Sequence, residues 1–144
     1  MATLDQAIAV AAKAHLGQMD KAGHPYILHP LRIMMRLESD EERMVAVLHD
    51  VIEDTALTLA KLRQLGFSET VLEALDRLTH RLGEQYEDYI ERVVEHPLAR
   101  RIKLMDLEDN MDVRRLANPL TDRDLARLQK YRRAWERLRA ISIP

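Results

Sequence analysis

The chain has 144 residues and no cysteine, which excludes disulfides, thiolate metal sites and cysteine nucleophiles. Its length suits one domain over residues 1–144, and its net charge of −2 does not indicate a nucleic-acid partner. The N-terminus lacks the basic cluster of a signal peptide and no apolar run approaches a membrane span, so we expect a cytoplasmic protein without a membrane partner. Whether it forms a homo-oligomer is left open.

Helical periodicity runs along nearly the whole sequence, and aromatic residues make up only 4% of it. The pattern predicts an all-α, single-domain helical bundle of about eight helices. They are expected over residues 3–16, 30–38, 40–53, 58–65, 68–82, 84–95, 98–116 and 121–141. Helix-capping residues are expected at Thr3, Asp40, Thr58, Ser68 and Thr121. Gly66 is placed to end a helix, and residues 17–29 form the longest loop.

The charge is distributed unevenly along the chain. Residues 1–96 hold 10 Lys/Arg and 17 Asp/Glu, whereas residues 97–144 hold 12 and 7. Attraction between the two parts of one fold would explain this difference. A basic rim that steers an anionic ligand is the alternative.

The stretch VAVLHDVIEDTA at 45–56 puts His49, Asp50, Glu53 and Asp54 on one arc of an otherwise apolar helix. A solvent-exposed face would show the same pattern. However, Asp50 and Asp54 form an i,i+4 pair of like charges, and the last turn of a helix disfavours anions. A bound divalent metal would offset both penalties, and both interpretations stay open.

The predicted helix at 98–116 carries apolar residues on several sides, which indicates that it is mostly buried. Asp106 lies on this helix, and Asn110 follows one turn later on the same face. A buried carboxylate needs a partner because an unpaired buried charge is very costly. Two kinds of partner are open: an ion pair with Arg32 or Arg36, and a metal or ligand site.

His29 ends the long loop and is followed by Pro30, which is suited to open a helix. A lone histidine at such a place is more often structural. Together with His49, Asp50 and Asp106, however, it makes a set of two nitrogen and two oxygen ligands without sulfur. Such a set suits Mn²⁺, Fe²⁺ or Zn²⁺.

Three segments, in this order, resemble the HD-domain metal-dependent phosphohydrolases: AHLGQMDKAGHPYILHP (14–30), AVLHDVIEDT (46–55) and IKLMDLEDNM (102–111). Within that superfamily they look like the hydrolase domain of RelA/SpoT-type enzymes and of small single-domain alarmone (ppGpp) hydrolases. The resemblance covers nearly the whole chain and implies an all-α fold of the HD-domain type. No synthetase segment is seen, so pyrophosphate transfer from ATP is not expected.

The resemblance also implies roles for individual residues. It implies that a divalent metal, typically Mn²⁺, is bound by His29, His49, Asp50 and Asp106. Glu53 and Asp54 match an acidic pair that positions or activates the attacking water.

Lys21, Asn110 and Tyr131 match residues that bind or approach the nucleotide substrate, Tyr131 through a loose alignment. The resemblance therefore implies hydrolysis of a nucleotide by metal-activated water, with a (p)ppGpp-like 3′-pyrophosphate as the family-like substrate.

The chain departs from the alarmone hydrolases at positions near the substrate. Asp20 and Ala22 replace an arginine and a serine in the loop, and Asp112 and Val113 replace an arginine and a threonine after the last motif. An aspartate repels phosphate, so these changes alter the expected substrate contacts but leave the metal ligands intact. We therefore expect metal-dependent phosphohydrolase activity ahead of hydrolysis of ppGpp in particular. The alternatives are hydrolysis of another phosphate ester, such as an NADPH-type 2′-phosphate, a catalytically silent metal- or nucleotide-binding sensor, and a metal-free scaffold.

Overall fold

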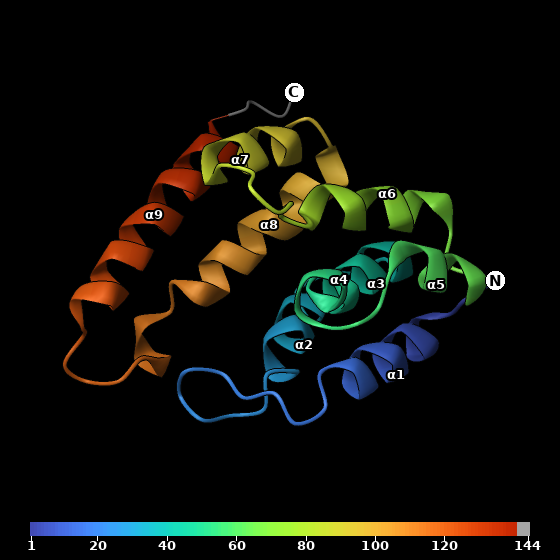
Figure 1. Ribbon diagram of the computed structural model, residues 1–144, viewed down its shortest axis with the longest axis horizontal. Coiled ribbons are helices and arrows are strands. Elements are labelled where there is room, and N and C mark those ends of the chain that lie inside the picture. The colour runs from blue at the N-terminus through green and yellow to red at the C-terminus, as the bar shows by residue number, and fades with distance from the viewer. Residues whose placement is uncertain (141–144) are drawn as a thin grey trace.

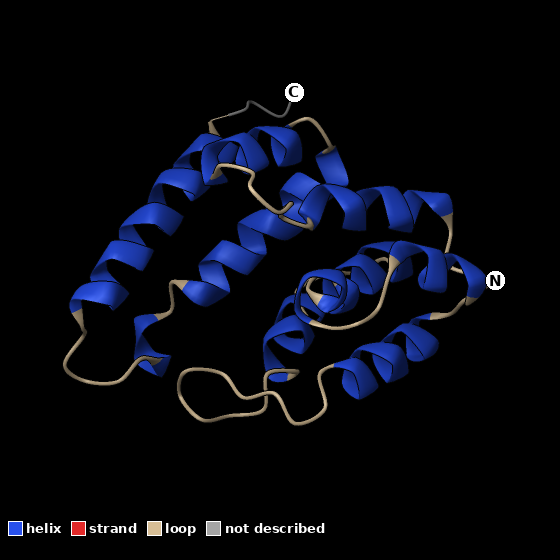
Figure 2. Ribbon diagram, in the orientation of Figure 1, coloured by secondary structure: helices blue, strands red, loops and turns tan. Residues whose placement is uncertain are grey.

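The computed structural model describes residues 1–140, so the predicted end of the last helix at residue 141 lies outside the described residues. Over this range the structure is all-helical, as predicted, and no strand is formed (Figure 2). The α-helices are α1 (Leu4–Ala14), α2 (Leu28–Met34), α3 (Asp40–Leu48), α4 (Val51–Asp54), α5 (Leu59–Gln64), α6 (Glu69–Leu78), α7 (Tyr86–Val94), α8 (Pro97–Asn110) and α9 (Asp122–Arg139). A 3₁₀ turn, η1, spans Val113–Arg115.

Helices α3 and α8 occupy the centre of the bundle (Figure 1). Helix α3 packs against α1, α2, α6 and α8, and helix α8 packs in addition against α2, α6, α7 and α9. Helices α1 and α9 lie on opposite sides of this central pair (Figure 1). None of the helices within residues 1–140 combines the length and the apolar character that a membrane span needs.

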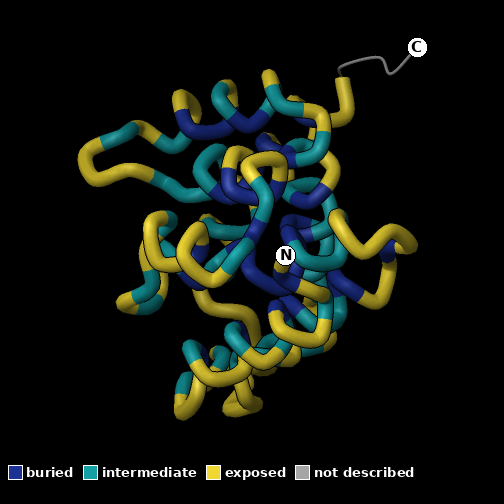
Figure 3. Tube along the Cα trace, turned by 90° about the vertical axis from the view of Figure 1, so that its right-hand side faces the viewer, coloured by how far each residue is buried: buried dark blue, intermediate teal, exposed yellow. Residues whose placement is uncertain are grey.

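The core lies between these helices, and Figure 3 shows the buried stretches gathered inside the exposed loops. Ile33, Leu48, Leu75, Ile102 and Leu107 are all fully buried. Each such side chain contributes about 1.5–3 kcal/mol through removal of its apolar surface from water. The core therefore fixes α2, α3, α6 and α8 relative to one another.

Side-chain caps begin most of the helices, because the first backbone amides of a helix have no partner within it. Four of the predicted caps are confirmed, namely Thr3, Thr58, Ser68 and Thr121. The prediction for Asp40 is wrong by one residue: Ser39 is the cap, and its hydroxyl accepts a hydrogen bond from the Glu42 amide. Gly66 follows the end of α5 with a φ of +97°, as expected for a glycine that ends a helix.

The helix predicted over 40–53 is broken at His49 and Asp50 into α3 and α4. The Nδ1 atom of His49 lies 2.6 Å from the carbonyl oxygen of Ala46. In a continuous helix that carbonyl would accept from the Asp50 amide, so the side chain takes the place of a backbone hydrogen bond. Residues 1–140 therefore form nine α-helices where about eight were predicted, because one predicted helix is split in two.

Two other predicted boundaries also differ. The helix predicted over 98–116 ends at Asn110, since the Asp112 side chain accepts from the Arg114 amide and starts η1 instead. The helix predicted over 30–38 begins at Leu28 and ends at Met34, after which the backbone continues as turns. Pro30 is thereby in the first turn, where its missing amide hydrogen costs nothing.

The acidic first part and the basic second part of the chain meet in ion pairs. Arg101 lies 3.3 Å from Glu42, and Arg137 lies 2.6 Å from Glu91. Arg101 and both members of the second pair are exposed to solvent, so each pair contributes little to stability.

Candidate metal centre

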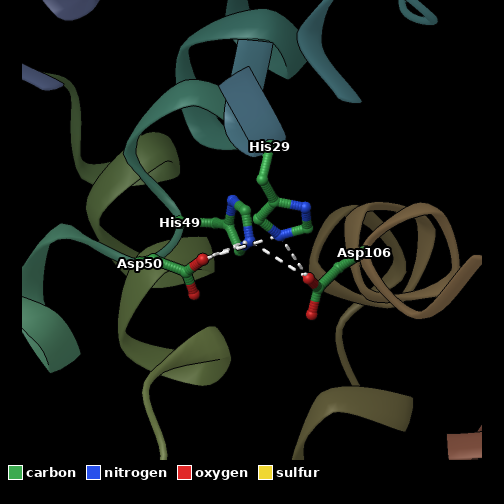
Figure 4. Close-up of side chains that lie close together, drawn as sticks. All are labelled: His29, His49, Asp50 and Asp106. Atoms are coloured by element: carbon green, nitrogen blue, oxygen red, sulfur yellow. Dashed lines mark hydrogen bonds and ion pairs between the residues drawn. The ribbon is translucent and has the colours of Figure 1, made fainter. Parts of the chain in front are cut away.

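Four side chains from three helical segments point toward one another (Figure 4). His29 comes from α2, His49 and Asp50 from the junction of α3 and α4, and Asp106 from α8. Each offers one ligand atom, and these four atoms all lie within 4.8 Å of one another. Both histidines and Asp106 are buried. The structure thus brings together all four predicted metal ligands.

The break between α3 and α4 allows neighbouring residues to face the same point. In a regular helix, adjacent side chains point about 100° apart. At the junction, Asp50 lies outside both helices, and its Oδ2 atom lies 3.0 Å from Nε2 of His49. His29 reaches the same point from α2, and its Nε2 atom lies 2.8 Å from Oδ1 of Asp106.

Hydrogen bonds fix which ring nitrogen of each histidine faces the cluster. Nδ1 of His49 donates to the Ala46 carbonyl, and Nδ1 of His29 donates to Oδ2 of Asp109 at 2.6 Å. Both Nε2 atoms therefore face the carboxylates. Nε2 of His49 is buried and makes no hydrogen bond of good geometry, although Asp50 is close. A buried nitrogen in this condition is suited to bind a cation.

The charges in the cluster shift the pKa values of its members. Burial by itself lowers the pKa of His49, but the nearby negative charges of Asp50 and Asp106 outweigh it and raise the pKa well above its usual value. Burial raises the pKa of Asp50, whereas the charge of the neighbouring His49 brings it down to about 2.

Asp106 finds a cationic partner, but not the predicted one. Its Oδ2 atom lies 2.6 Å from Nζ of Lys103, one turn earlier on α8. The predicted arginine partners are engaged elsewhere, Arg32 with Asp109 and Arg36 with Glu108. The ion-pair alternative is thus wrong for the arginines, and the other carboxylate oxygen of Asp106 faces the histidines.

Glu53 and Asp54 lie beside this cluster on α4. The Glu53 carboxylate accepts a hydrogen bond from the His80 amide at 2.7 Å. Burial, followed by the nearby charges of Asp50 and Glu53, raises the pKa of Asp54 to about 6. The like-charge pair expected from the sequence is thus present in the folded protein.

Two cavities adjoin the cluster and share a wall. The larger has a volume of about 520 Å³ and the smaller about 230 Å³. Residues that line both are Tyr26, Asp54, Asn110 and Tyr131. Lys21 lines only the larger cavity, whereas Glu53, Asp50 and Asp106 line only the smaller. All three predicted substrate residues therefore lie at the larger cavity, and two of them lie on the shared wall.

Several polar residues at the site were not identified from the sequence. Tyr26 donates a hydrogen bond to Asp50, and Asp109 holds His29. Arg115 and Arg127 line the larger cavity. For Asp109 the position next to Asn110, on the same short helical turn as Asp106, was a usable signal. Arg115 and Arg127 are two of the many basic residues in the second part of the chain. Nothing in the sequence indicated that these two would line the cavity.

The residues that depart from the alarmone hydrolases have partners within the chain. The Asp20 carboxylate accepts hydrogen bonds from the amides of Ala22 and His24, both at 2.9 Å. Asp112 pairs with Arg114 and Arg115. Their negative charge at the cavity is therefore partly compensated.

Several curated proteins that are similar to the chain carry related names. No family model matches the chain. The bifunctional (p)ppGpp synthase/hydrolase SpoT of Escherichia coli (strain K12) is 37% identical over 139 residues, which cover 86% of this chain and 20% of that protein. A GTP pyrophosphokinase of Streptomyces coelicolor is 34% identical over 145 residues, which cover 94% of this chain and 16% of that protein. The chain thus spans about a fifth of the length of these relatives.

A solved structure shares the fold. The chain of a metazoan ortholog of SpoT that hydrolyses ppGpp superposes with a TM-score of 0.79 at 21% sequence identity. The match covers 94% of this chain and 84% of that one. In sequence and in fold, the chain is an HD-type RelA/SpoT hydrolase-like domain.

Proposed function

We propose that residues 1–144 form a single metal-dependent phosphohydrolase domain that hydrolyses a nucleotide, with a (p)ppGpp-like 3′-pyrophosphate as the substrate. One observation carries the proposal: four ligand atoms converge within 4.8 Å beside two acidic side chains and at the edge of a 520 Å³ cavity. The names of the relatives, among them a guanosine-3′,5′-bis(diphosphate) 3′-pyrophosphohydrolase of Aquifex aeolicus that is 31% identical over 119 residues, point to the same substrate.

The residues present fit a divalent metal. His29, His49, Asp50 and Asp106 provide two imidazole nitrogens and two carboxylate oxygens, which suits Mn²⁺, Fe²⁺ or Zn²⁺, and we propose Mn²⁺. The buried Nε2 atom of His49 supports this because it lacks a good hydrogen bond within the described residues. When bound, such an ion lowers the pKa of a coordinated water and polarises a phosphoryl oxygen.

Glu53 and Asp54 are suited to transfer the proton of the attacking water. A side chain moves a proton best when its pKa is close to the working pH, and the pKa of Asp54 is raised to about 6. We infer that one of the two carboxylates accepts a proton from the attacking water and returns it to the leaving 3′ oxygen. The hydrogen bond from the His80 amide holds Glu53 in place for this task.

The nucleoside part would occupy the larger cavity. Lys21, Asn110 and Tyr131 line it, and Arg115 and Arg127, each paired with an aspartate, line it as well. A phosphate on the nucleoside would be bound there by charge-assisted hydrogen bonds.

A turnover assay tests the function. We expect the Mn²⁺-loaded protein to release pyrophosphate from (p)ppGpp, and neither the chelated protein nor Asp106→Ala to do so. Activity that survives both treatments would contradict the metal-dependent mechanism. Metal content, measured in the same samples, shows whether a loss of turnover is due to loss of the bound ion or to loss of the catalytic step itself.

One observation favours another phosphate ester as substrate. Arg32 and Arg115 at the larger cavity are already paired with Asp109 and Asp112. Less positive charge is then free for a nucleoside that carries several phosphates. The assay should therefore include pppApp, NADPH and simple nucleotides, and a higher kcat/KM for one of these than for (p)ppGpp would identify it.

A further inference from the structure

The smaller cavity contains two side chains that the proposed function does not use, Tyr86 and Lys130. They come from α7 and α9, which pack against each other. Both line the cavity whose wall also includes Asp50 and Asp106 of the candidate metal centre. They therefore border the same space as Glu53 and the candidate metal ligands Asp50 and Asp106.

The hydroxyl group of Tyr86 is buried without a hydrogen-bond partner among the described residues. Burial, above all, raises the pKa of Tyr86 to about 12, so the hydroxyl keeps its proton and is available as a donor. Leaving a buried hydroxyl without a hydrogen bond is unfavourable for the folded protein. A ligand with an acceptor oxygen in this cavity would offset that cost.

Lys130 adds a cation to the same place. Its Nζ atom lies 4.3 Å from the centre of the Tyr86 ring. Within residues 1–140 its ammonium group makes no ion pair, in contrast to Lys103 on the same cavity wall, which is paired with Asp106. The cation–π contact holds the Lys130 ammonium group over the Tyr86 ring but leaves its charge available for an anion.

The positions of the two cavities relative to the candidate metal ligands indicate which anion Tyr86 and Lys130 would bind. The larger cavity has the room for a nucleoside, and the candidate metal ligands Asp50 and Asp106 lie on the wall of the smaller one. A substrate that spans both would place its scissile phosphorus near Asp54 and Asn110, which line both cavities. The group released by hydrolysis would then extend toward Tyr86 and Lys130.

We propose that the Tyr86 hydroxyl and the Lys130 ammonium group bind the outer phosphoryl group of a diphosphate and so select pyrophosphate esters over monophosphate esters. This inference rests on the proposed function for the position of the scissile phosphorus. Two donors on one phosphoryl group, one of them charged, form the kind of contact that binds phosphate well.

The reaction is balanced with this arrangement. The oxygen of a water molecule forms a bond to the inner phosphorus, and the bond from that phosphorus to the nucleoside 3′ oxygen breaks. The 3′ oxygen takes up one proton of the water, and inorganic pyrophosphate is released carrying the water oxygen, while the second proton of the water passes to the pyrophosphate or to the solvent. The outer phosphoryl group is unchanged throughout, so Tyr86 and Lys130 act by binding it.

The test is the binding of inorganic pyrophosphate and of orthophosphate to the Mn²⁺-loaded full chain, measured by isothermal titration calorimetry. We expect pyrophosphate to bind more tightly than orthophosphate. Tyr86→Phe and Lys130→Met should each weaken pyrophosphate binding about tenfold, since each removes one hydrogen bond to a charged group. Orthophosphate binding should change less than about twofold because it occupies only the inner position.

Lys61→Met is the matched control, because Lys61 lies exposed on α5 and away from both cavities. It should leave the binding of both anions unchanged. Melting temperature and Mn²⁺ affinity, measured for every variant, show that the fold and the metal centre are intact. Tyr86→Phe keeps the ring, so it reports on the hydroxyl alone.

Three results would overturn the inference: no preference for pyrophosphate in the unsubstituted protein, an equal loss for both anions in the variants, or no loss for either. If no nucleotide is hydrolysed but the variants still lose pyrophosphate selectively, the proposed function fails and the binding role of Tyr86 and Lys130 stands. If nucleotides are hydrolysed but selectivity does not depend on these residues, the proposed function stands and the inference fails.

Discussion

The carboxylate of Asp109 accepts a hydrogen bond from Nδ1 of His29 at 2.6 Å, and Arg32 donates two hydrogen bonds of 2.9 Å to the same carboxylate. His29 and Asp109 are 80 positions apart in the chain, yet this contact determines that Nε2 of His29 faces the other three candidate ligands. Such a partner orients a metal-binding histidine and raises its basicity.

Removing this partner should weaken metal binding. We expect Asp109→Ala to raise the dissociation constant for Mn²⁺ about 10–100-fold, because His29 then loses its fixed orientation. Titration with Mn²⁺ under chelator competition measures this. Glu108→Ala is the control, since its carboxylate contacts Arg36 and Trp135 and not the cluster. Equal affinities in the two variants would contradict a role for Asp109.

Metal removal should lower thermal stability. A ligand that binds only the folded protein stabilises it by about 2.7 kcal/mol at a concentration 100 times its dissociation constant. We therefore expect Mn²⁺ to raise the melting temperature relative to chelated protein, and Asp106→Asn to abolish that rise. Asp112→Asn, which alters an ion pair outside the cluster, should keep it. A rise that persists in Asp106→Asn would show that Mn²⁺ binds elsewhere.

The acidic pair on α4 should separate chemistry from metal binding. We expect Glu53→Gln and Asp54→Asn each to lower kcat, by about 10²–10⁴ for the residue that transfers the proton. Mn²⁺ affinity should stay within a few-fold, because neither side chain belongs to the ligand cluster. Glu87→Gln, an exposed position on α7, is the control. Turnover that is unaffected in both variants would exclude the pair from proton transfer.

An ion pair away from the cavities should make stability depend on pH. Arg92 donates to Glu84 through Nε and Nη2 at 2.6 and 2.8 Å, and these hydrogen bonds lower the pKa of Glu84 from 4.5 to about 2. The stabilisation is therefore present above pH 4.5 and is lost as the pH falls toward 2. Both side chains are mostly shielded from solvent, with exposed fractions of 18% and 13%.

Glu84→Gln should accordingly cost about 2 kcal/mol near pH 7, and the difference from the unsubstituted protein should shrink between pH 4.5 and 2. Urea unfolding at several pH values measures it. Glu69→Gln, which breaks the exposed pair with Arg63, should change stability little at any pH. A constant difference down to the lowest pH would show that charge is not its cause.

The sequence by itself determined the all-α class, most helix starts and the set of four candidate ligands. It did so because helical periodicity and capping are local properties, and because the motifs around His29, His49 and Asp106 are distinct in kind and order. Lys103 stands one turn before Asp106, a spacing at which i,i+3 ion pairs form, but the partners predicted for Asp106 were Arg32 or Arg36 instead.

Only the tertiary structure decided how distant residues meet. The break at His49 depends on a side chain replacing a backbone hydrogen bond, which periodicity does not encode. The contact of Asp109 with His29 and that of Lys130 with Tyr86 depend on how α8 packs on α2 and how α9 packs on α7. Helix packing angles follow from the summed shapes of many side chains, so residues far apart in sequence acquire their neighbours only when the whole core is assembled.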